Sequence, residues 1–182
     1  MAAASFFRSL FLNYFVKPVC ERSLFRSVSS VKPQRIVEIG LGDGERALDL
    51  IELAQRNRPT FEIRYIGLDL FDARTNEAPL KLKDAHQSLK ASGASIQLIP
   101  GPPIESLSRV ANNLAGTDML IISASADENR EPDWYFIPRM MNDHSLVFWQ
   151  TGVDQPYTKL ALKDVRELAE KQSRESSERK AA

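Results

Sequence analysis

The feature that most constrains this chain is residues 36–44, Ile-Val-Glu-Ile-Gly-Leu-Gly-Asp-Gly, where an apolar run ends in three glycines at alternate positions. The glycines are Gly40, Gly42 and Gly44, and Glu38 lies two residues before the first of them. Glycine has no Cβ and accepts a positive φ, so such a turn lets the main chain pass close to a ligand. Ligands of open α/β sheets bind at the carboxyl ends of the strands. The pattern therefore predicts a first strand followed by a ligand-binding turn.

Apolar runs alternate with amphipathic helical patterns from residue 35 onward. The predicted strands cover residues 35–40, 63–70, 95–100, 118–123 and 145–150. The predicted helices after the first strand cover residues 45–56, 80–91, 104–114, 134–141 and 157–172. Four of the strands are almost continuously apolar, as strands buried on both faces must be. Because parallel crossovers are right-handed, we expect an α/β fold with a doubly wound, mainly parallel five-stranded sheet and helices on both faces.

Composition fits one domain and excludes some classes of function. Acids and bases balance at 24 each, which leaves no overall field to hold nucleic acid. The single cysteine, Cys20, has no partner for an internal disulfide, and no Cys/His cluster has zinc spacing. We therefore expect a cytoplasmic protein that binds neither nucleic acid nor metal.

The two ends of the chain differ from the predicted Rossmann-like domain, residues 31–172. Residues 1–30 are expected to form an amphipathic helical segment, whose apolar run is too short against the roughly 20 residues of a membrane span. Its basic, serine-rich character is also typical of an organelle-targeting peptide, so an organelle is the alternative to a cytoplasmic location. Residues 173–182 are almost wholly polar and are expected to be a disordered tail. The apolar stripe of the first segment is Phe7, Leu10, Phe11, Tyr14 and Phe15.

Two nucleotide-binding motifs do not match the glycine-rich turn. A dinucleotide fingerprint needs a third glycine where this sequence has Glu45, and an acid there repels a pyrophosphate. A P-loop needs Gly-Lys-Ser/Thr after the glycines, which is absent. The sequence therefore argues against an NAD-linked oxidoreductase and against a P-loop enzyme.

The run Glu38-Ile39-Gly40-Leu41-Gly42-Asp43-Gly44 resembles the Glu-x-Gly-x-Gly-x-Gly loop of class I S-adenosylmethionine-dependent methyltransferases. The second predicted strand ends in an acid, Asp69, as in that family. The resemblance covers residues 35–152 and implies the strand order 3-2-1-4-5 with S-adenosyl-L-methionine as cofactor. It implies that the three glycines approach the methionine and ribose, and that Glu38 supports the loop or the ligand ammonium. It further implies that Asp69 accepts hydrogen bonds from both ribose hydroxyls and that Leu70 packs near the adenine.

The catalytic group is not identified by the sequence. The fourth predicted strand is followed by Asp127 and Glu128, which are weak candidates for a general base. Two carboxylates in a loop supply too few oxygen ligands for a hard cation, so we expect no metal. Methyl transfer can proceed mainly by holding the nucleophile in line with the methyl carbon. The expected activity is methyl transfer to an unidentified small-molecule substrate.

Two departures from the family pattern support an alternative, a non-catalytic binding or assembly module with the same fold. After the third predicted strand, Pro102 and Pro103 replace the family's acid and remove two backbone donors. The residues after Gly152 suffice for one helix, so the sheet is expected to lack the usual sixth and seventh strands. An open edge strand at residues 145–150 would favour association, from which we predict a possible homodimer.

Overall fold

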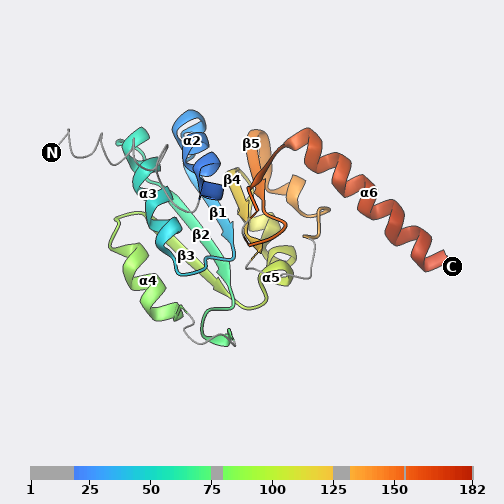
Figure 1. Ribbon diagram of the computed structural model, residues 1–182, viewed down its shortest axis with the longest axis horizontal. Helices are drawn as coiled ribbons and strands as arrows, with labels where there is room; N and C mark the ends of the chain where they lie inside the picture. Colours follow the sequence, from blue (N-terminus) through green and yellow to red (C-terminus); the bar gives the residue numbers. More distant parts are fainter. Residues whose placement is uncertain (1–18, 75–79, 125–131, 154, 182) are drawn as a thin grey trace.

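The computed structural model describes residues 19–74, 80–124, 132–153 and 155–181 (Figure 1). The strands are β1 (Arg35–Ile39), β2 (Arg64–Asp69), β3 (Ser95–Pro100), β4 (Thr117–Ile122), β5 (Met141–Trp149) and β6 (Thr158–Ala161). The α-helices are α2 (Arg22–Val31), α3 (Glu45–Asn57), α4 (Leu82–Lys90), α5 (Pro103–Val110) and α6 (Leu162–Ala181). Short 3-10 helices are η1 (Val19–Glu21), η2 (Phe71–Ala73), η3 (Ala111–Leu114) and η5 (Ile137–Arg139).

The strands form a single sheet in the order β3-β2-β1-β4-β5-β6. The first five are parallel, and their order is the predicted 3-2-1-4-5. Ile39 of β1 pairs with Leu68 of β2 on one side and with Ile122 of β4 on the other. The carboxyl ends of these three central strands therefore lie at the same edge of the sheet.

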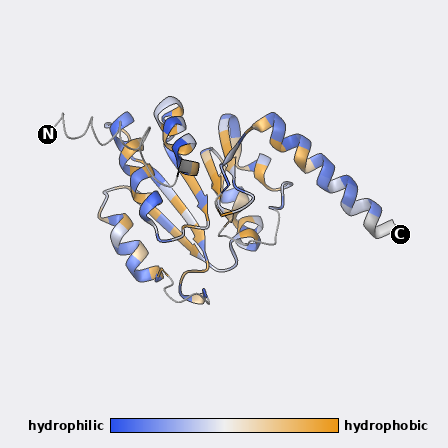
Figure 2. Cartoon of the chain, in the orientation of Figure 1, coloured by the Kyte–Doolittle hydropathy of each residue, from blue (hydrophilic) through white to orange (hydrophobic). Residues whose placement is uncertain are grey.

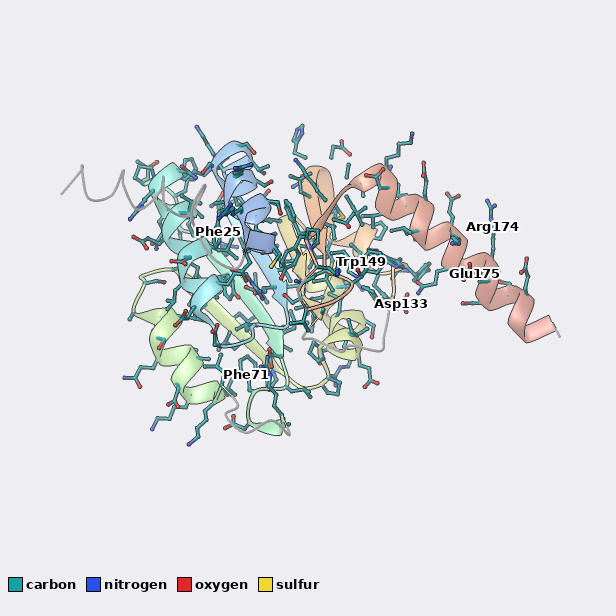
Figure 3. All side chains as sticks on the ribbon, in the orientation of Figure 1. Phe25, Phe71, Asp133, Trp149, Arg174 and Glu175 are labelled. Carbon is teal, nitrogen blue, oxygen red and sulfur yellow. The ribbon has the colours of Figure 1, made fainter. Side chains whose placement is uncertain are left out.

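Helices cover both faces of the sheet, because successive strand residues alternate between two apolar layers. Ile36 of β1 packs in the layer under α2, α3 and α4, whereas Val37 and Ile39 pack in the layer under α5 and the start of α6. Figure 2 shows apolar residues concentrated in the strands and on the helix faces turned to them. In Figure 3, Phe25 marks the α2 side of this core, and Phe71 lies near the lower end of the sheet, where the arrows of β2 and β3 end.

The prediction of a five-stranded sheet is wrong, because β6 pairs antiparallel with β5. Trp149 lies opposite Thr158, and Leu146 lies opposite Ala161. The chain reverses after β5 in a turn that Gln150 holds, since its side-chain amide donates to the carbonyls of Val153 and Gln155. Because β6 covers the edge of β5, the open edge that motivated a homodimer is absent, and the dimer stays a prediction without that support.

Two predicted helices also need correction. The predicted helix at residues 157–172 begins as strand β6, and α6 starts only at Leu162. The predicted helix at residues 134–141 shrinks to the 3-10 turn η5, because Met141 already belongs to β5. In both places the pairing of a strand with β4 or β5 outweighs the local helical pattern.

Helix α6 runs away from the sheet to the end of the described chain (Figure 1). It continues through residues 173–181, beyond the boundary drawn for the predicted domain. Figure 2 shows this part as mostly hydrophilic, and Figure 3 marks Arg174 and Glu175 on it. Ion pairs one helical turn apart, Lys171 with Glu175 and Arg174 with Glu170, support the exposed helix. No helix within the described ranges is long and apolar enough to cross a membrane.

Candidate functional site

The glycine-rich turn joins β1 to α3 at the carboxyl edge of the sheet. Gly40, Gly42 and Gly44 all have positive φ, at 82°, 68° and 86°. A side chain at these positions would be strained, which explains the alternate spacing of the glycines. A Cβ at Gly42 would meet nothing within 4 Å, so there is open space beside the middle of the turn. The predicted turn is therefore present and has room beside it at Gly42.

The tips of β1 and β2 meet through Asp69. The Gly40 N–H donates to the Leu68 carbonyl at 2.9 Å, and the Leu41 N–H donates to Asp69 Oδ2 at 2.7 Å. The Phe71 N–H donates to the other carboxylate oxygen, Oδ1, at 3.0 Å. Asp69 is only 2% exposed. The structure thus brings together the glycine turn and the acid that the sequence analysis singled out, with half-buried Leu70 following it.

Arg74 completes the surroundings of Asp69. Its Nε donates to Asp69 Oδ1 at 2.8 Å, and its Nη2 forms an ion pair with Oδ2. Its Nη1 donates to the Gly42 carbonyl at 3.1 Å. The carboxylate therefore accepts four hydrogen bonds, two from the main chain and two from one guanidinium. Sequence analysis missed this residue, because nothing in the pattern around Arg74 distinguishes it from an ordinary loop arginine.

Glu38 does not line the open edge of the sheet, because its side chain is fully buried on the α3 side. Arg46, in the first turn of α3, donates from Nε to Glu38 Oε1 at 2.7 Å, and the Tyr65 hydroxyl bonds to Oε2. The other contacts of the Arg46 guanidinium are the Gly40 carbonyl at 2.9 Å, Ser123 Oγ at 2.8 Å and Glu21 Oε1 at 3.0 Å. Glu38 thus supports the loop through Arg46, and the same guanidinium ties η1, α3 and the tips of β1 and β4 together.

Burial and neighbouring charges shift the pKa values of several groups in this network. Burial is the largest single effect on Arg46 and would lower its pKa, but the negative charges around it, first that of Glu38, together outweigh burial, and the net shift is upward. Burial and the neighbouring Glu38 charge raise the pKa of Tyr65 well above its usual value. Burial raises the pKa of Tyr157 to about 12, against the opposing effect of Arg46. Both phenols are therefore neutral near pH 7, and neither is a general base.

Glu21 and Glu38 share the single guanidinium of Arg46, so with both ionised the network has one excess negative charge. Burial raises the pKa of Glu21, and the Arg46 charge offsets part of this shift. Such a negative environment is compatible with a cationic ligand nearby, because opposite charges attract. It is unfavourable for a phosphate at the start of α3.

The tips of β3 and β4 show two further features. After β3, Gly101 has a φ of 125°, Pro103 is the first residue of α5, and Ser106 Oγ lies 3.3 Å from where a Gly101 Cβ would be. The described loop thus carries no acid at the position where the family has one. After β4, buried Ser123 is engaged by Arg46 and by the Tyr157 hydroxyl at 2.9 Å.

Asp127 and Glu128, the weak catalytic candidates, lie outside the described residues. Among the residues that are described, no group of three His, Cys, Asp or Glu side chains is placed to hold a metal ion. A cavity of about 520 Å³ lies between α5, the segment before η5 and α6, away from the glycine turn. Its lining includes Glu105, Tyr135 and Gln172.

Comparisons with known proteins identify no family for this chain. No protein-family model matches the sequence, and no curated protein matches it. Among solved structures, cofactor-bound Rv0187 from MTB is similar with 17% identity and a TM-score of 0.47, over 81% of this chain and 63% of that one. MNMC2 from Aquifex aeolicus has 13% identity and a TM-score of 0.47, over 69% of this chain and 45% of that one.

A third similar structure is a putative protein-L-isoaspartate O-methyltransferase from Plasmodium falciparum in complex with S-adenosyl-L-homocysteine. It has 15% identity and a TM-score of 0.47, over 81% of this chain and 68% of that one. The chain thus spans less than two thirds of the first two structures. At these identities and TM-scores the similarity carries no conclusion about ligands or reactions. The order of the first five strands of this chain is the order 3-2-1-4-5 that the sequence resemblance implies.

Proposed function

We propose that this chain is an S-adenosylmethionine-dependent methyltransferase that acts on a small molecule. The observation that carries the proposal is the contact between Asp69 and the glycine turn, in which the Leu41 N–H donates to the Asp69 carboxylate at 2.7 Å. This contact holds the Asp69 carboxylate beside a turn that has open space at Gly42, where the carboxylate would be the acceptor for a ribose diol. Asp69 and the glycine turn both lie at the carboxyl edge of the sheet, where ligands of α/β folds bind.

The residues of the edge fit the cofactor in part. Asp69 would accept from the ribose hydroxyls, the glycines would let the methionine portion approach, and Leu70 would pack near the adenine. When bound, the cofactor supplies an electrophilic methyl group on a positively charged sulfur. The negative charge around Glu21 and Glu38 suits that cation.

The buried hydroxyl groups beside the turn are not available as general bases. Tyr65 and Tyr157 keep their protons near pH 7, and the Ser123 hydroxyl is bonded to Arg46 and Tyr157. The role of these residues is therefore to hold the turn and the ends of β1 and β4 in place. Positioning alone can supply a large share of the rate of a bimolecular transfer.

The alternative is a non-catalytic binding or assembly module that keeps the fold. Two arginines favour this alternative, because they occupy acceptor atoms that a ligand would otherwise use. Arg74 donates to both carboxylate oxygens of Asp69, and Arg46 donates to Glu38 Oε1. The proline pair at residues 102–103 also supports it, since the adenine contact of the family is missing there.

Isothermal titration with S-adenosyl-L-homocysteine separates the two functions. A methyltransferase should bind it saturably, and ligand at 100 times Kd should stabilise the fold by about 2.7 kcal/mol. Asp69→Asn, which keeps size and removes charge, should weaken binding at least tenfold. The matched control is Asp72→Asn, the same change at an exposed acid three residues on, which should leave Kd unchanged.

Absence of binding at millimolar ligand by the folded wild-type chain would rule out the methyltransferase and favour the module. Equal affinity of wild type and Asp69→Asn would also contradict the assigned role of Asp69. Circular dichroism of each variant confirms that a loss of binding is not a loss of fold.

A further inference from the structure

Arg74 occupies the face of Asp69 that a ribose diol would use. Two of its N–H groups, on Nε and Nη2, approach the two oxygens of the Asp69 carboxylate side by side. Two neighbouring hydroxyls of a ribose would donate to a carboxylate in the same paired way. The other acceptor positions of Asp69 are already filled by the N–H groups of Leu41 and Phe71. A diol and Arg74 therefore compete for one pair of acceptor sites.

The main chain between these residues is shaped to bring Arg74 back onto Asp69. Phe71 is fully buried and has a φ of 47°, a conformation that costs a non-glycine residue of order 1 kcal/mol. Phe71 is the first residue of the 3-10 turn η2, and Arg74 directly after the turn donates its N–H to the Phe71 carbonyl at 3.1 Å. The strain at buried Phe71 is a second indication that the local fold itself holds Arg74 against Asp69.

The two partners differ in how freely they can move. Asp69 is only 2% exposed and is fixed by main-chain donors, whereas the Arg74 side chain is 14% exposed. Arginine is a long side chain whose charged end can find water when it leaves a carboxylate. The exchange that frees the site therefore moves Arg74 and leaves Asp69 and the glycine turn in place.

We propose that Arg74 is an intramolecular competitor that closes the Asp69 site against ribonucleosides and sets the affinity for any ligand with a vicinal diol. The inference rests on the proposed function, because the diol is that of the cofactor. A bound diol must replace charge-assisted hydrogen bonds, so the wild-type chain binds more weakly than the site without its arginine.

The test is isothermal titration of the full chain with S-adenosyl-L-homocysteine, comparing wild type with Arg74→Ala. The variant should bind about 10- to 100-fold more tightly, as expected for release from hydrogen bonds to a charged group. Arg74→Lys, which keeps the charge but loses the two-pronged fork, should lie between wild type and Arg74→Ala. The control Arg56→Ala removes an arginine paired with Glu52 on α3 and should leave Kd unchanged.

A second probe isolates the diol. Adenosine should gain affinity from Arg74→Ala, whereas 2′,3′-dideoxyadenosine, which lacks both hydroxyls, should not. An equal gain for both probes would show that the arginine acts by bulk or charge and would overturn the inference.

The outcomes also separate this inference from the proposed function. If wild type binds S-adenosyl-L-homocysteine and Arg74→Ala binds it equally or less tightly, the competition is refuted while the cofactor assignment stands. If neither wild type, Arg74→Ala nor Arg74→Lys binds at millimolar ligand, the proposed function fails and the inference fails with it. Circular dichroism establishes that each variant is folded.

Discussion

Replacing Arg46 by methionine should destabilise the fold far more than the loss of a surface ion pair. The guanidinium is 12% exposed and donates to four groups, which are Glu21, Glu38, the Gly40 carbonyl and Ser123. Methionine has similar length but no donor. Its introduction leaves Glu38, which is fully buried, with the Tyr65 hydroxyl as the remaining partner among the contacts described above.

The expected magnitude follows from that uncompensated buried charge. Removing one partner of a buried ion pair costs about 3–5 kcal/mol in unfolding free energy. For a chain of this length each kcal/mol lowers Tm by about 2–4 °C, so Tm should fall by about 6–20 °C. Equilibrium unfolding in urea, followed by circular dichroism, measures the loss. The matched control is Arg56→Met on the same helix, whose pair with Glu52 is partly exposed and should cost about 0.5 kcal/mol or less.

A double-mutant cycle with Glu38→Gln tests the cause. With the Glu38 charge removed, Arg46→Met should cost less than it does in the wild-type background, because no buried carboxylate is left without its cation. A loss below about 1 kcal/mol in the single variant would refute the reasoning. So would a cost of Arg46→Met that is the same with and without the Glu38 charge.

Two further predictions concern groups close to the turn. Because the pKa of Tyr157 is raised to about 12 by burial, the folded state holds this proton more tightly than the unfolded state, and the resulting stability is complete below pH 10 and is lost as pH rises toward 12. Tyr157→Phe has no phenol to ionise, so between pH 9 and 12 its unfolding free energy should fall by roughly 2–3 kcal/mol less than that of wild type, as measured by urea unfolding. Identical pH profiles of the two proteins would contradict this prediction. Gly67→Ala should cost about 1–3 kcal/mol by overpacking, since the added Cβ would lie 2.9 Å from Leu41 Cδ1 and 3.0 Å from Leu98 Cδ2. An unchanged urea midpoint for Gly67→Ala would show that both leucines repack without cost.

The parts of the fold that were predictable are those with a strong local or periodic signal. Five strands follow from apolar runs between helical patterns, and their parallel order places all their carboxyl ends at one edge. The meeting of Asp69 with the glycine turn follows from the same geometry, because both residues end neighbouring strands. The short strand β6 gave no such signal, since its four residues are mostly exposed and run directly into α6.

The partners of the two acids could not be predicted, because each pairing depends on how the chain reverses direction in space. Arg46 looks like a surface residue at the start of a helix, yet it reaches the buried Glu38 because α3 begins directly over the tip of β1. Arg74 looks like a loop residue, yet the positive φ of Phe71 turns it back onto Asp69. Under the proposed function, the motif predicts where a ligand would meet the chain, and Arg74 competes for the acceptors of Asp69 there. The tenfold or larger gain expected for Arg74→Ala is similar in size to the loss expected for Asp69→Asn, so under the proposed function the arginine matters to binding as much as the acid.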